Sequence, residues 1–300
     1  MKFENILILG GSGELGTNLV SFLRNKYNIF IFDKKYPNVK YNNVKFIKGN
    51  LLNIQSLRKI PKNISAAIFL VGHIGGSRSL EEKFLNNYIK FNCDTLVNFL
   101  SNVSLKFFKK IIFMSTEHVY GDHKINSNLE SHPKNYYGVS KLISEKICYN
   151  FFKKTRISVD IIRFPRVIIR NNFSIISSMI KQAKINSKII INKNKIFFNF
   201  LYIDDFIKSI HLCLNYKKKK FRIINIFNDS KPITLYQLAI KVKKLFKKKV
   251  HIKNKKMFFI YDHNPKFVDI DKNKTLKILN WKPIYSTDEI IKKVFNYETK

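Results

Sequence analysis

The chain has 300 residues, 45% of them hydrophobic and 27 of them phenylalanine, which predicts a globular protein with a buried core rather than a disordered one. Its formal net charge is +36, yet the lysines are spread along the whole sequence instead of forming one stripe. Lys, Asn, Ile, Phe and Tyr, the residues of A/T-rich codons, are all abundant, so codon bias accounts for the charge. We therefore expect a solvated basic surface with weak attraction to polyanions and no specific nucleic-acid site.

The cysteines and the apolar runs indicate a cytoplasmic protein. Cys93, Cys148 and Cys213 lie far apart and lack the paired spacing of metal ligands, so we expect reduced thiols and no metal site. No apolar run approaches the roughly 18 residues that a membrane span requires. The first apolar run stops at a glycine after four residues, which argues against a signal peptide.

Short apolar runs alternate with helical periodicity through the first half of the chain. The predicted strands are Asn5–Leu9, Ile29–Asp33, Val44–Lys48, Ala66–Val71, Ile111–Ser115 and Val159–Arg163. Helical spacing follows the first strand at residues 15–23 and continues over residues 139–152. Repeated units of this kind predict an α/β fold, a Rossmann-type doubly wound parallel sheet with helices on both faces.

The alternation becomes less regular after about residue 165. A strand-like Ile223–Phe227 follows, with helices near residues 203–215 and 234–247, and all ten glycines precede residue 139. We predict a dinucleotide-binding domain over residues 1–165, which segments near residues 200–228 rejoin. Residues 166–300 would mainly form a smaller, mostly helical substrate lobe.

Four glycines crowd the turn between the first strand and the first helix. Gly10, Gly13 and Gly16 are separated by two residues each, and Gly11 follows the first of them. Backbone N–H groups at the start of a helix can hold a pyrophosphate, and glycine lets the phosphate approach. We therefore predict that this loop binds a dinucleotide, with contacts from Ser12, Glu14 and Leu15.

Asp33 ends the second predicted strand, 17 residues after Gly16. A carboxylate there can accept hydrogen bonds from both ribose hydroxyls, and it repels a 2′-phosphate. Lys34 and Lys35 follow directly and could accommodate that phosphate. The sequence therefore favours NAD, with NADP less favoured, and a simple turn aspartate is the structural alternative.

Tyr137 and Lys141 are four residues apart near the start of a predicted helix and so share one face. A lysine ammonium near the phenol would lower the tyrosine pKa and let it exchange a proton with a hydroxyl or carbonyl. Ser115 and Thr116 end the fifth strand, at the sheet edge where ligands bind. Glu117 and His118 come next and add two groups that can carry protons, or else form an ordinary polar loop.

These motifs together resemble the extended short-chain dehydrogenase/reductases of the NAD-dependent epimerase/dehydratase family, which act mostly on nucleotide sugars. The resemblance rests on the glycine loop, Asp33, Gly49-Asn50-Leu51, Val71-Gly72-His73, Asn92, Ser115-Thr-Glu-His-Val-Tyr-Gly121, Tyr137-Gly-Val-Ser-Lys141, Arg163, Tyr202-Ile-Asp-Asp205, Asp269-Ile-Asp-Lys272 and Leu279-Asn-Trp-Lys-Pro283. It implies that Tyr137 is the acid/base, that Lys141 binds the nicotinamide ribose and tunes the tyrosine, and that Thr116, beside Ser115, holds the reacting oxygen.

The same resemblance implies further contacts and a homodimer formed through a helix bundle. The implied cofactor contacts are Asn50, Leu51, Val71, Gly72, Asn92 and Phe164. His73 and His118 are candidate substrate contacts, and Glu117 is a candidate second catalytic acid.

The second half departs from the family pattern where the diphosphate is usually held. Phe198 stands where an arginine is common, and Lys266 stands where a second one is frequent. Arg163, Arg166 and Arg170, however, fall within eight positions. Because arginine offers a bidentate fork to phosphate, we predict that Arg166 or Arg170 takes over part of this contact; a surface role is the alternative.

The predicted function is an NAD-dependent enzyme that moves a hydride between a sugar carbon and nicotinamide. An epimerase, which needs only Tyr137, Thr116 and a sugar that can turn over in the site, is the first choice, and the length of 300 residues fits a compact epimerase or a reductase. A 4,6-dehydratase, with Glu117 as an added acid, and a ketosugar reductase stay open. A non-catalytic dinucleotide sensor is the alternative from another class, and the Tyr137–Lys141 pair argues against it.

Overall fold

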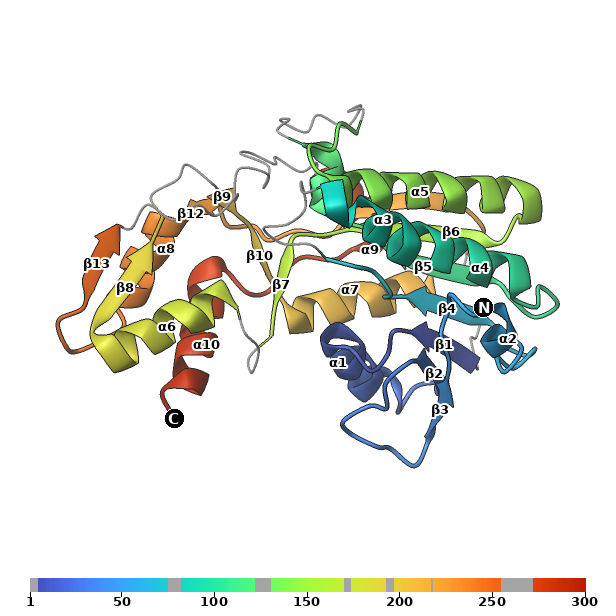
Figure 1. Ribbon diagram of the computed structural model, residues 1–300, viewed down its shortest axis with the longest axis horizontal. Helices are drawn as coiled ribbons and strands as arrows, with labels where there is room; N and C mark the ends of the chain where they lie inside the picture. Colours follow the sequence, from blue (N-terminus) through green and yellow to red (C-terminus); the bar gives the residue numbers. More distant parts are fainter. Residues whose placement is uncertain are drawn as a thin grey trace.

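The computed structural model describes residues 5–74, 82–121, 131–169, 174–192, 197–216, 218–254 and 272–300. Its centre is a seven-stranded sheet with the strand order β11-β6-β5-β4-β1-β2-β3 (Figure 1). The strands are β1 (Asn5–Leu9), β2 (Asn28–Asp33), β3 (Val44–Lys48), β4 (Ala66–Phe69), β5 (Lys110–Met114), β6 (Ser158–Arg163) and β11 (Phe221–Asn225). Every neighbouring pair is parallel, which confirms the predicted doubly wound sheet.

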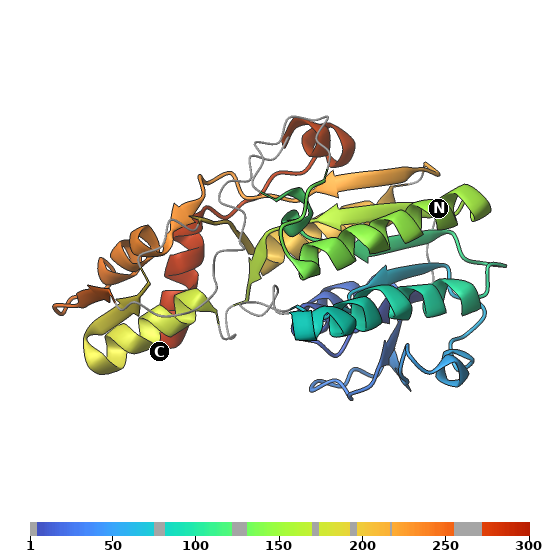
Figure 2. The same cartoon turned by 45° about the horizontal axis from the view of Figure 1, so that its top comes forward.

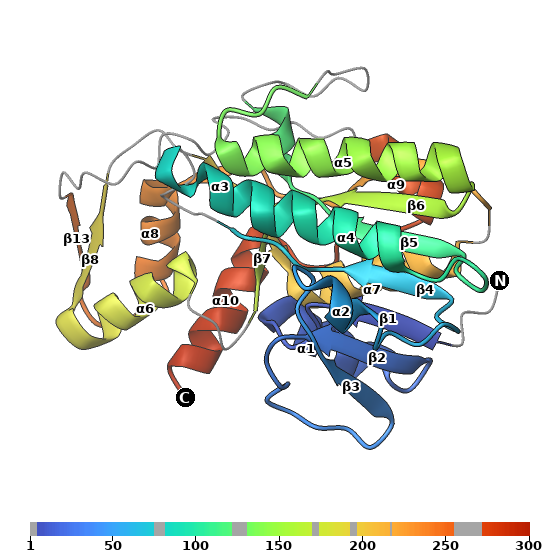
Figure 3. The ribbon, with the colours of Figure 1, turned by 45° about the vertical axis from the view of Figure 1, so that its right-hand side comes forward.

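Both faces of the sheet are covered, which explains why its central strands are continuous apolar runs. Ile6 and Ile8 of β1 join one core cluster, and Leu7 and Leu9 join the other. The helices of the sheet domain are α1 (Glu14–Leu23), α2 (Ile54–Leu57), α3 (Leu85–Tyr88), α4 (Thr95–Asn102), α5 (Tyr136–Thr155) and α7 (Ile203–Asn215). The helices α3, α4 and α5 lie along one face (Figure 3), while α1 and α7 contact each other on the opposite face.

The order of the strands positions a binding site. Consecutive strands turn outward from β1 to β2 and β3, whereas β4 returns to the other side of β1. The carboxyl ends of β1 and β4 therefore border the point where the direction of winding reverses, and ligands of open α/β sheets bind at such points.

The helix α5 carries the predicted Tyr137–Lys141 pair, and it begins three residues before the range that periodicity predicted. Asn135 explains this start, because its side-chain Oδ1 accepts the backbone N–H of Gly138 at 2.7 Å. Such a cap satisfies one of the N–H groups that have no partner within the helix. Tyr137 is thereby placed in the first helical turn.

Most of the remaining elements form a lobe beside the carboxyl edge of the sheet (Figure 2). Its helices are α6 (Ile175–Asn186), α8 (Leu235–Lys243) and α10 (Thr287–Glu298), whereas α9 (Lys272–Leu279) packs against β11 and α7 of the sheet domain. Small two-stranded sheets pair β7 (Arg166–Ile168) with β10 (Phe200–Tyr202), β8 (Lys188–Ile191) with β13 (His251–Asn254), and β9 (Phe197–Phe198) with β12 (Ile233–Thr234). The lobe is thus largely helical, with added short sheets that the sequence pattern did not predict.

The segments near residues 200–228 return to the sheet. The helix α7 contacts β5, and β11 pairs in parallel with β6, from Phe221 opposite Val159 to Asn225 opposite Arg163. The exact division of the chain at residue 165 stays a prediction. No helix in the described ranges is both long and apolar enough to cross a membrane.

Candidate active site

The glycine loop joins β1 to α1 at the reversal point of the sheet. A Cβ on Gly16 would lie 2.5 Å from the carbonyl oxygen of Gly10, so the helix packs against the loop more closely than any other residue allows. Gly13 is the N-cap of α1, and a Cβ there would meet, among the described residues, no heavy atom closer than Gly10 O at 3.4 Å. The surface over the helix N-terminus is therefore open to an anion.

Asp33 lies beside this loop, at the end of β2. Its Oδ2 accepts the backbone N–H of Ser12 at 3.1 Å, and its Oδ1 accepts that of Lys35 at 3.2 Å. The half-buried carboxylate is thus held against the glycine loop. This is the placement that the ribose-binding prediction for Asp33 requires.

The segments after β3 and β4 complete this side of the site. Asn50 Oδ1 accepts the backbone N–H of Leu52 at 3.1 Å, and the carbonyl of buried Leu51 accepts Nδ2 of Asn98 at 3.0 Å. Val71 packs against the loop, since its Cγ2 would be 3.1 Å from a Cβ on Gly10. Both segments are therefore fixed by the fold.

Asn92 ties together the ends of β4 and α5. It is fully buried in a π-helical turn, η3 (Ile89–Asp94), of a kind common at functional sites. Its Oδ1 accepts the backbone N–H of His73 at 2.6 Å, and its Nδ2 donates to Ser140 Oγ at 2.8 Å. A Cβ on Gly72 would lie 2.9 Å from Lys141 Nζ and 3.0 Å from Asn92 Oδ1. Gly72, Asn92 and Lys141 thus meet at one point, as their implied roles require.

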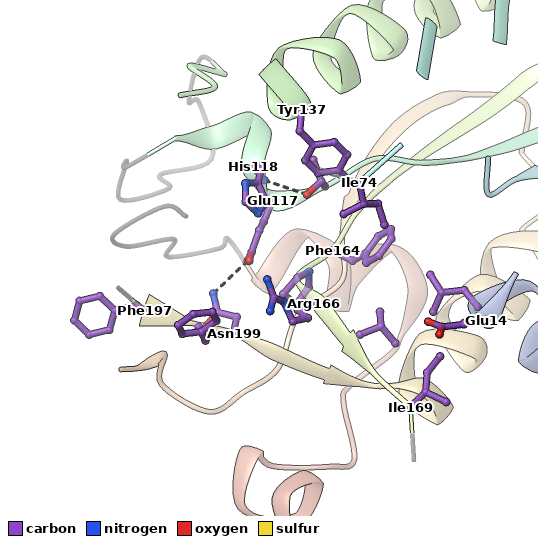
Figure 4. A pocket seen from close by; sticks show the side chains of 15 residues that line it. Glu14, Ile74, Glu117, His118, Tyr137, Phe164, Arg166, Ile169, Phe197 and Asn199 are labelled. Atoms are coloured by element: carbon purple, nitrogen blue, oxygen red, sulfur yellow. Dashed lines mark hydrogen bonds between the residues drawn. The ribbon is translucent and has the colours of Figure 1, made fainter. Parts of the chain in front are cut away.

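A cavity of about 210 Å³ lies next to this point, between the sheet and the lobe (Figure 4). Its lining brings together several predicted site residues: Glu14, Leu15, Thr116, Glu117, His118, Tyr137, Phe164 and Arg166. Asn199 also lines it, although nothing in the sequence pointed to that residue. His73 does not; its ring lies 5.1 Å from that of Tyr88, centroid to centroid.

Tyr137 does not have the lowered pKa that the sequence predicted. Burial raises the pKa of Tyr137 to about 12, and a hydrogen bond with Thr116 acts in the opposite direction. Lys141 turns inward, donates to the carbonyl of Met114 at 3.0 Å, and lies 4.9 Å from the ring centre of Phe113. The prediction that Lys141 lowers the tyrosine pKa is therefore wrong for the protein alone, because loss of solvation dominates.

Lys141 has a perturbed pKa of its own. Burial lowers the pKa of its ammonium to about 8, and the nearby Cys93, Cys148 and Glu145 act in the opposite direction. The ammonium is still largely protonated at neutral pH. It provides a fixed positive charge behind the pocket wall.

Ser115 occupies a place different from the one expected of a catalytic group. Its hydroxyl donates a hydrogen bond to Oε1 of Glu145. The same oxygen accepts a second hydrogen bond, from Nε of Arg163, at 2.9 Å. Arg163 Nη2 lies 2.5 Å from Glu145 Oε2, and all three side chains are buried. Ser115 is not part of the pocket lining, so its expected catalytic role is not supported. It instead anchors the end of β5 to α5.

Glu117 and His118 belong to the 3₁₀ turn η4 (Glu117–Tyr120) and border the pocket. Burial raises the pKa of Glu117 to about 7, while its hydrogen bond from Asn199 Nδ2 (3.2 Å) and the charge of Arg166 act in the opposite direction. Burial lowers the pKa of His118 to about 4, and Arg166 adds to that shift. At neutral pH the pocket thus holds a carboxyl near its midpoint and a neutral imidazole.

Arg166 belongs to the opposite wall. It is exposed, and its guanidinium carbon lies 5.5 Å from the ring centre of Phe198, a cation–π arrangement. Phe198, which stands where the resemblance places an arginine, therefore contacts Arg166 of β7 through its ring. Arg170 and Lys266 lie outside the described residues.

The family model described as "NAD dependent epimerase/dehydratase family" matches residues 6–226 of the chain. The chain belongs to this family. The match covers the whole seven-stranded sheet except the first residue of β1, together with the first elements of the lobe. Family enzymes are NAD-dependent and include epimerases and dehydratases.

Relatives of both reaction types are similar to this family member. The dTDP-D-glucose 4,6-dehydratase of Dictyostelium discoideum is 28% identical over 258 residues, which are 75% of this chain but 58% of that protein. The UDP-glucuronate 4-epimerase of Thermodesulfobacterium geofontis is 26% identical over 274 residues, covering 86% and 80% of the two chains. This chain thus spans little more than half of the first relative and most of the second.

Solved structures share the fold from end to end. The UDP-glucuronic acid 4-epimerase from Bacillus cereus, in complex with UDP-glucuronic acid and NAD, superposes with a TM-score of 0.86 at 23% identity, covering 98% of this chain and 99% of that one. The dTDP-glucose 4,6-dehydratase from Bacillus anthracis, in complex with NAD, gives 0.81 at 19% identity, covering 99% and 96%. The fold is thus shared with both an epimerase and a dehydratase.

Clusters of three or more side chains that could hold a metal ion do not occur in the described part of the chain. The three cysteines are all buried and free.

Proposed function

We propose that this chain binds NAD and moves a hydride between nicotinamide and a carbon of a nucleotide-linked sugar, with Tyr137 as the acid/base. One observation carries the proposal: Tyr137, hydrogen-bonded to Thr116, borders a pocket that the cofactor loop lines from one side and Arg166 from the other. A substrate oxygen in this pocket would meet both a proton donor and a hydroxyl that can hold it.

The residues of the sheet edge fit the cofactor. The open N-terminus of α1 at Gly13 suits a pyrophosphate, and the Asp33 carboxylate suits ribose hydroxyls, which favours NAD over NADP. Gly72, Asn92 and Lys141 would hold the nicotinamide end. The bound cofactor would supply the hydride acceptor and donor.

A substitution of Gly13 by alanine tests this fit. The added Cβ stays at 3.4 Å from Gly10 O, so we expect thermal unfolding close to that of the wild type. It would cover the surface that the phosphate approaches, so NAD affinity should fall at least about tenfold in calorimetric titration. Unchanged affinity would exclude this loop as the phosphate site.

Tyr137 holds its proton at neutral pH and is ready to donate it to a carbonyl oxygen, because burial raises its pKa. The reverse step, removal of a hydroxyl proton, needs the phenolate. Positive charge near the phenolic oxygen would stabilise that form, and the bound cofactor would have to change the surroundings of Tyr137 for the phenolate to form. Thr116 would orient the reacting oxygen.

Arg166 is the proposed contact to the substrate diphosphate. It is exposed within the pocket lining and lies over Phe198, on the wall that faces Tyr137. A planar guanidinium supported by an aromatic ring can offer two N–H groups to one phosphate. Arg170 and Lys266 stay sequence predictions for the same role.

Epimerisation is the reaction we propose first, and 4,6-dehydration is the second candidate. The specific observation that favours dehydration is the buried carboxyl of Glu117, whose pKa of about 7 suits an additional acid. Ketosugar reduction needs no further group. A non-catalytic sensor would have no use for Tyr137 and Thr116 at one pocket.

Product analysis separates these reactions. Purified protein is incubated with NAD(H), NADP(H) and a panel of nucleotide sugars, and the products are examined by mass spectrometry and NMR. Unchanged mass with inverted stereochemistry identifies an epimerase, loss of water a dehydratase, and stoichiometric use of reduced cofactor a reductase. Failure of every sugar, together with nucleic-acid binding that survives physiological salt, would instead support a regulator.

We also propose that the chain forms a homodimer through α4 and α5, which run side by side on the outer layer (Figure 3). Val97 of α4 and Ile143 and Tyr149 of α5 are exposed at 42%, 40% and 40%. Sedimentation velocity measures the assembly directly. A monomer at concentrations well above those used in assays would contradict the proposal.

A further inference from the structure

The orientation of His118 is determined by the residue that starts the catalytic helix. Asn135 Nδ2 lies 3.0 Å from His118 Nδ1. The other end of the same amide, Oδ1, accepts the backbone N–H of Gly138 at 2.7 Å. Because a backbone N–H can only donate, Oδ1 must face Gly138, and the NH₂ group must face the histidine.

This assignment decides which nitrogen of the ring carries the proton. The NH₂ group of Asn135 donates to His118, so Nδ1 is the acceptor and is not protonated. The proton of the neutral ring then resides on Nε2. Rotating the amide would place two acceptors, or two donors, against each other and would uncap α5.

The surroundings leave little room for another arrangement. Asn135 is 3% exposed, and a Cβ on Gly138 would lie 2.6 Å from the carbonyl oxygen of His118, so α5 packs directly on the histidine backbone. The ring of Tyr137 stands edge to face with that of His118, with 5.6 Å between centroids. The side chain is thus held by contacts on several sides.

The opposite nitrogen of the ring has no hydrogen-bond partner within the ranges that the structure describes. His118 lines the pocket. Its Nε2 has no partner among the described residues and yet is not one of the fully buried atoms without one, so this nitrogen is open to the pocket. In an imidazole ring the two nitrogens point in widely different directions, so Nε2 is directed away from Asn135. A polar atom of the ring is therefore available to a ligand.

We propose that His118 is a fixed, neutral residue whose Nε2–H donates a hydrogen bond to an oxygen of the substrate. It transfers no proton in the reaction. The identity of that oxygen acceptor rests on the proposed function; the protonation state does not.

The consequence concerns loss of water from the substrate. Eliminating water requires one group to remove a carbon-bound proton while another protonates the departing hydroxyl. Glu117 can serve as one of them, but a histidine with Nδ1 occupied and Nε2 protonated has no lone pair to offer. Of these two residues only Glu117 can then move a proton, so loss of water from the substrate would need Tyr137 as the second proton-moving group.

The charged groups around His118 agree with this assignment. Arg166 faces it from β7 and disfavours a second positive charge, Glu117 precedes it in the turn, and Tyr137 is a neutral phenol. Burial and Arg166 both lower the pKa of His118, to about 4. The neutral form therefore persists throughout the range in which an enzyme assay is run.

Nitrogen-15 NMR of the histidine rings tests the proposal without any substrate. Correlations between ring carbons and nitrogens distinguish the two tautomers, and the His118 signals are assigned by their loss in His118→Gln. We expect the Nε2–H tautomer at neutral pH and no titration down to about pH 5. An Nδ1–H tautomer, or titration near the ordinary histidine value of about 6.5, would overturn the proposal.

Asn135→Asp provides the matched perturbation. Aspartate keeps an acceptor for Gly138 N–H and caps helices as well as asparagine, so we expect α5 to stay folded. It places a carboxylate oxygen against Nδ1, which should move the proton to Nδ1 and raise the histidine pKa by at least about one unit. An unchanged tautomer in this variant would show that Asn135 does not control the ring.

Two substitutions of His118 itself distinguish a hydrogen-bonding role of this side chain from a role in filling space. Gln keeps an N–H donor near the position of Nε2, whereas Leu fills the space without one. We expect His118→Leu to lose about tenfold in kcat/KM, mostly through KM, and His118→Gln to lose about threefold or less. Equal losses in both variants would exclude the donor role. Correct tautomers with no nucleotide-sugar turnover would contradict the proposed function alone.

Discussion

The two walls of the pocket are built in different ways. On the sheet side, the helix α5, which carries Tyr137 and Lys141, is held by two buried amides: Asn92 donates to Ser140, and Asn135 accepts the backbone N–H of Gly138. On the lobe side, short two-stranded sheets present an exposed arginine over an aromatic ring. The sheet side resembles the interior of a protein, and the lobe side resembles its surface.

Under the proposed function, this difference separates the proton-transfer groups from the substrate-binding groups. Groups that move protons need fixed positions and low solvation, which shift their pKa values. Groups that hold a diphosphate need reach and charge, which a solvated arginine provides. Changes in the sheet wall should therefore alter turnover and stability, whereas changes in the lobe wall should alter affinity.

Tyr137→Phe is expected to have the largest effect. Removing the phenolic hydroxyl deletes the proposed acid/base, so kcat should fall by about a thousandfold or more with little change in NAD affinity. Tyr136→Phe is the matched control, because the neighbouring residue does not line the pocket. A Tyr137→Phe variant with full turnover would remove Tyr137 from the mechanism.

Glu145→Gln tests how far the sheet wall depends on its buried ion pair. Glu145 and Arg163 are 3% and 6% exposed, and breaking such a pair leaves an uncompensated charge in the interior. We expect a loss of about 3 kcal/mol in the free energy of unfolding, measured by urea denaturation. Asp288→Asn breaks the exposed pair with Lys241 and should cost less than about 1 kcal/mol. Equal losses would mean that burial does not set the strength of these pairs.

Glu117→Gln tests the sheet wall through the pH dependence of the free energy of unfolding. In the unfolded chain this carboxyl ionises near 4.5, whereas in the folded protein burial raises its pKa to about 7. The folded state therefore binds the extra proton between these values, and its stability falls as pH rises from about 4.5 to about 7.

Glutamine cannot ionise, so the variant escapes this loss. Relative to the wild type, Glu117→Gln should gain about 3 kcal/mol of stability between pH 4.5 and pH 8. The lowered pKa of His118 affects both proteins, so the difference isolates Glu117. A constant difference across pH would mean that the carboxyl is ionised in the folded protein.

Arg166→Ala is expected to have the smallest effect, on the lobe wall. Loss of one charge-assisted phosphate contact should raise KM about tenfold and leave kcat and unfolding nearly unchanged. Arg58→Ala removes another exposed arginine that does not line the pocket. If both variants bind substrate as well as the wild type, Arg166 has no part in recognition.

The sequence predicted the sheet closely because its strands are short, mainly apolar runs between polar turns. Five-residue β1, for example, matches its predicted range at both ends. The small sheets of the lobe escaped prediction, since a strand of two residues such as Phe197–Phe198 has no detectable alternation. These short strands are stabilised by pairing with segments far away in the sequence, which no local pattern reveals.

The residues of the site also fall into two groups: those that a local motif predicts and those that depend on distant contacts. Thr116 and Tyr137 could be found from motifs, because their spacing from strand ends places them at the sheet edge. Asn199 could not, since it meets Glu117 across 82 positions of sequence. The inward turn of Lys141 and the anchoring of Ser115 on Glu145 likewise depend on partners that no local pattern reveals.

By itself, the amino-acid sequence determined the main strands of a parallel α/β sheet, the position of the glycine loop and the residues that can exchange protons, because these follow from local apolar patterns and short-range spacing. The tertiary structure alone decided the charge states. Burial sets the pKa values of Tyr137, Glu117 and His118, and the contact with Asn135 sets the tautomer of His118. Solvation and hydrogen bonding depend on which distant segments surround a group, and only folding brings those segments together.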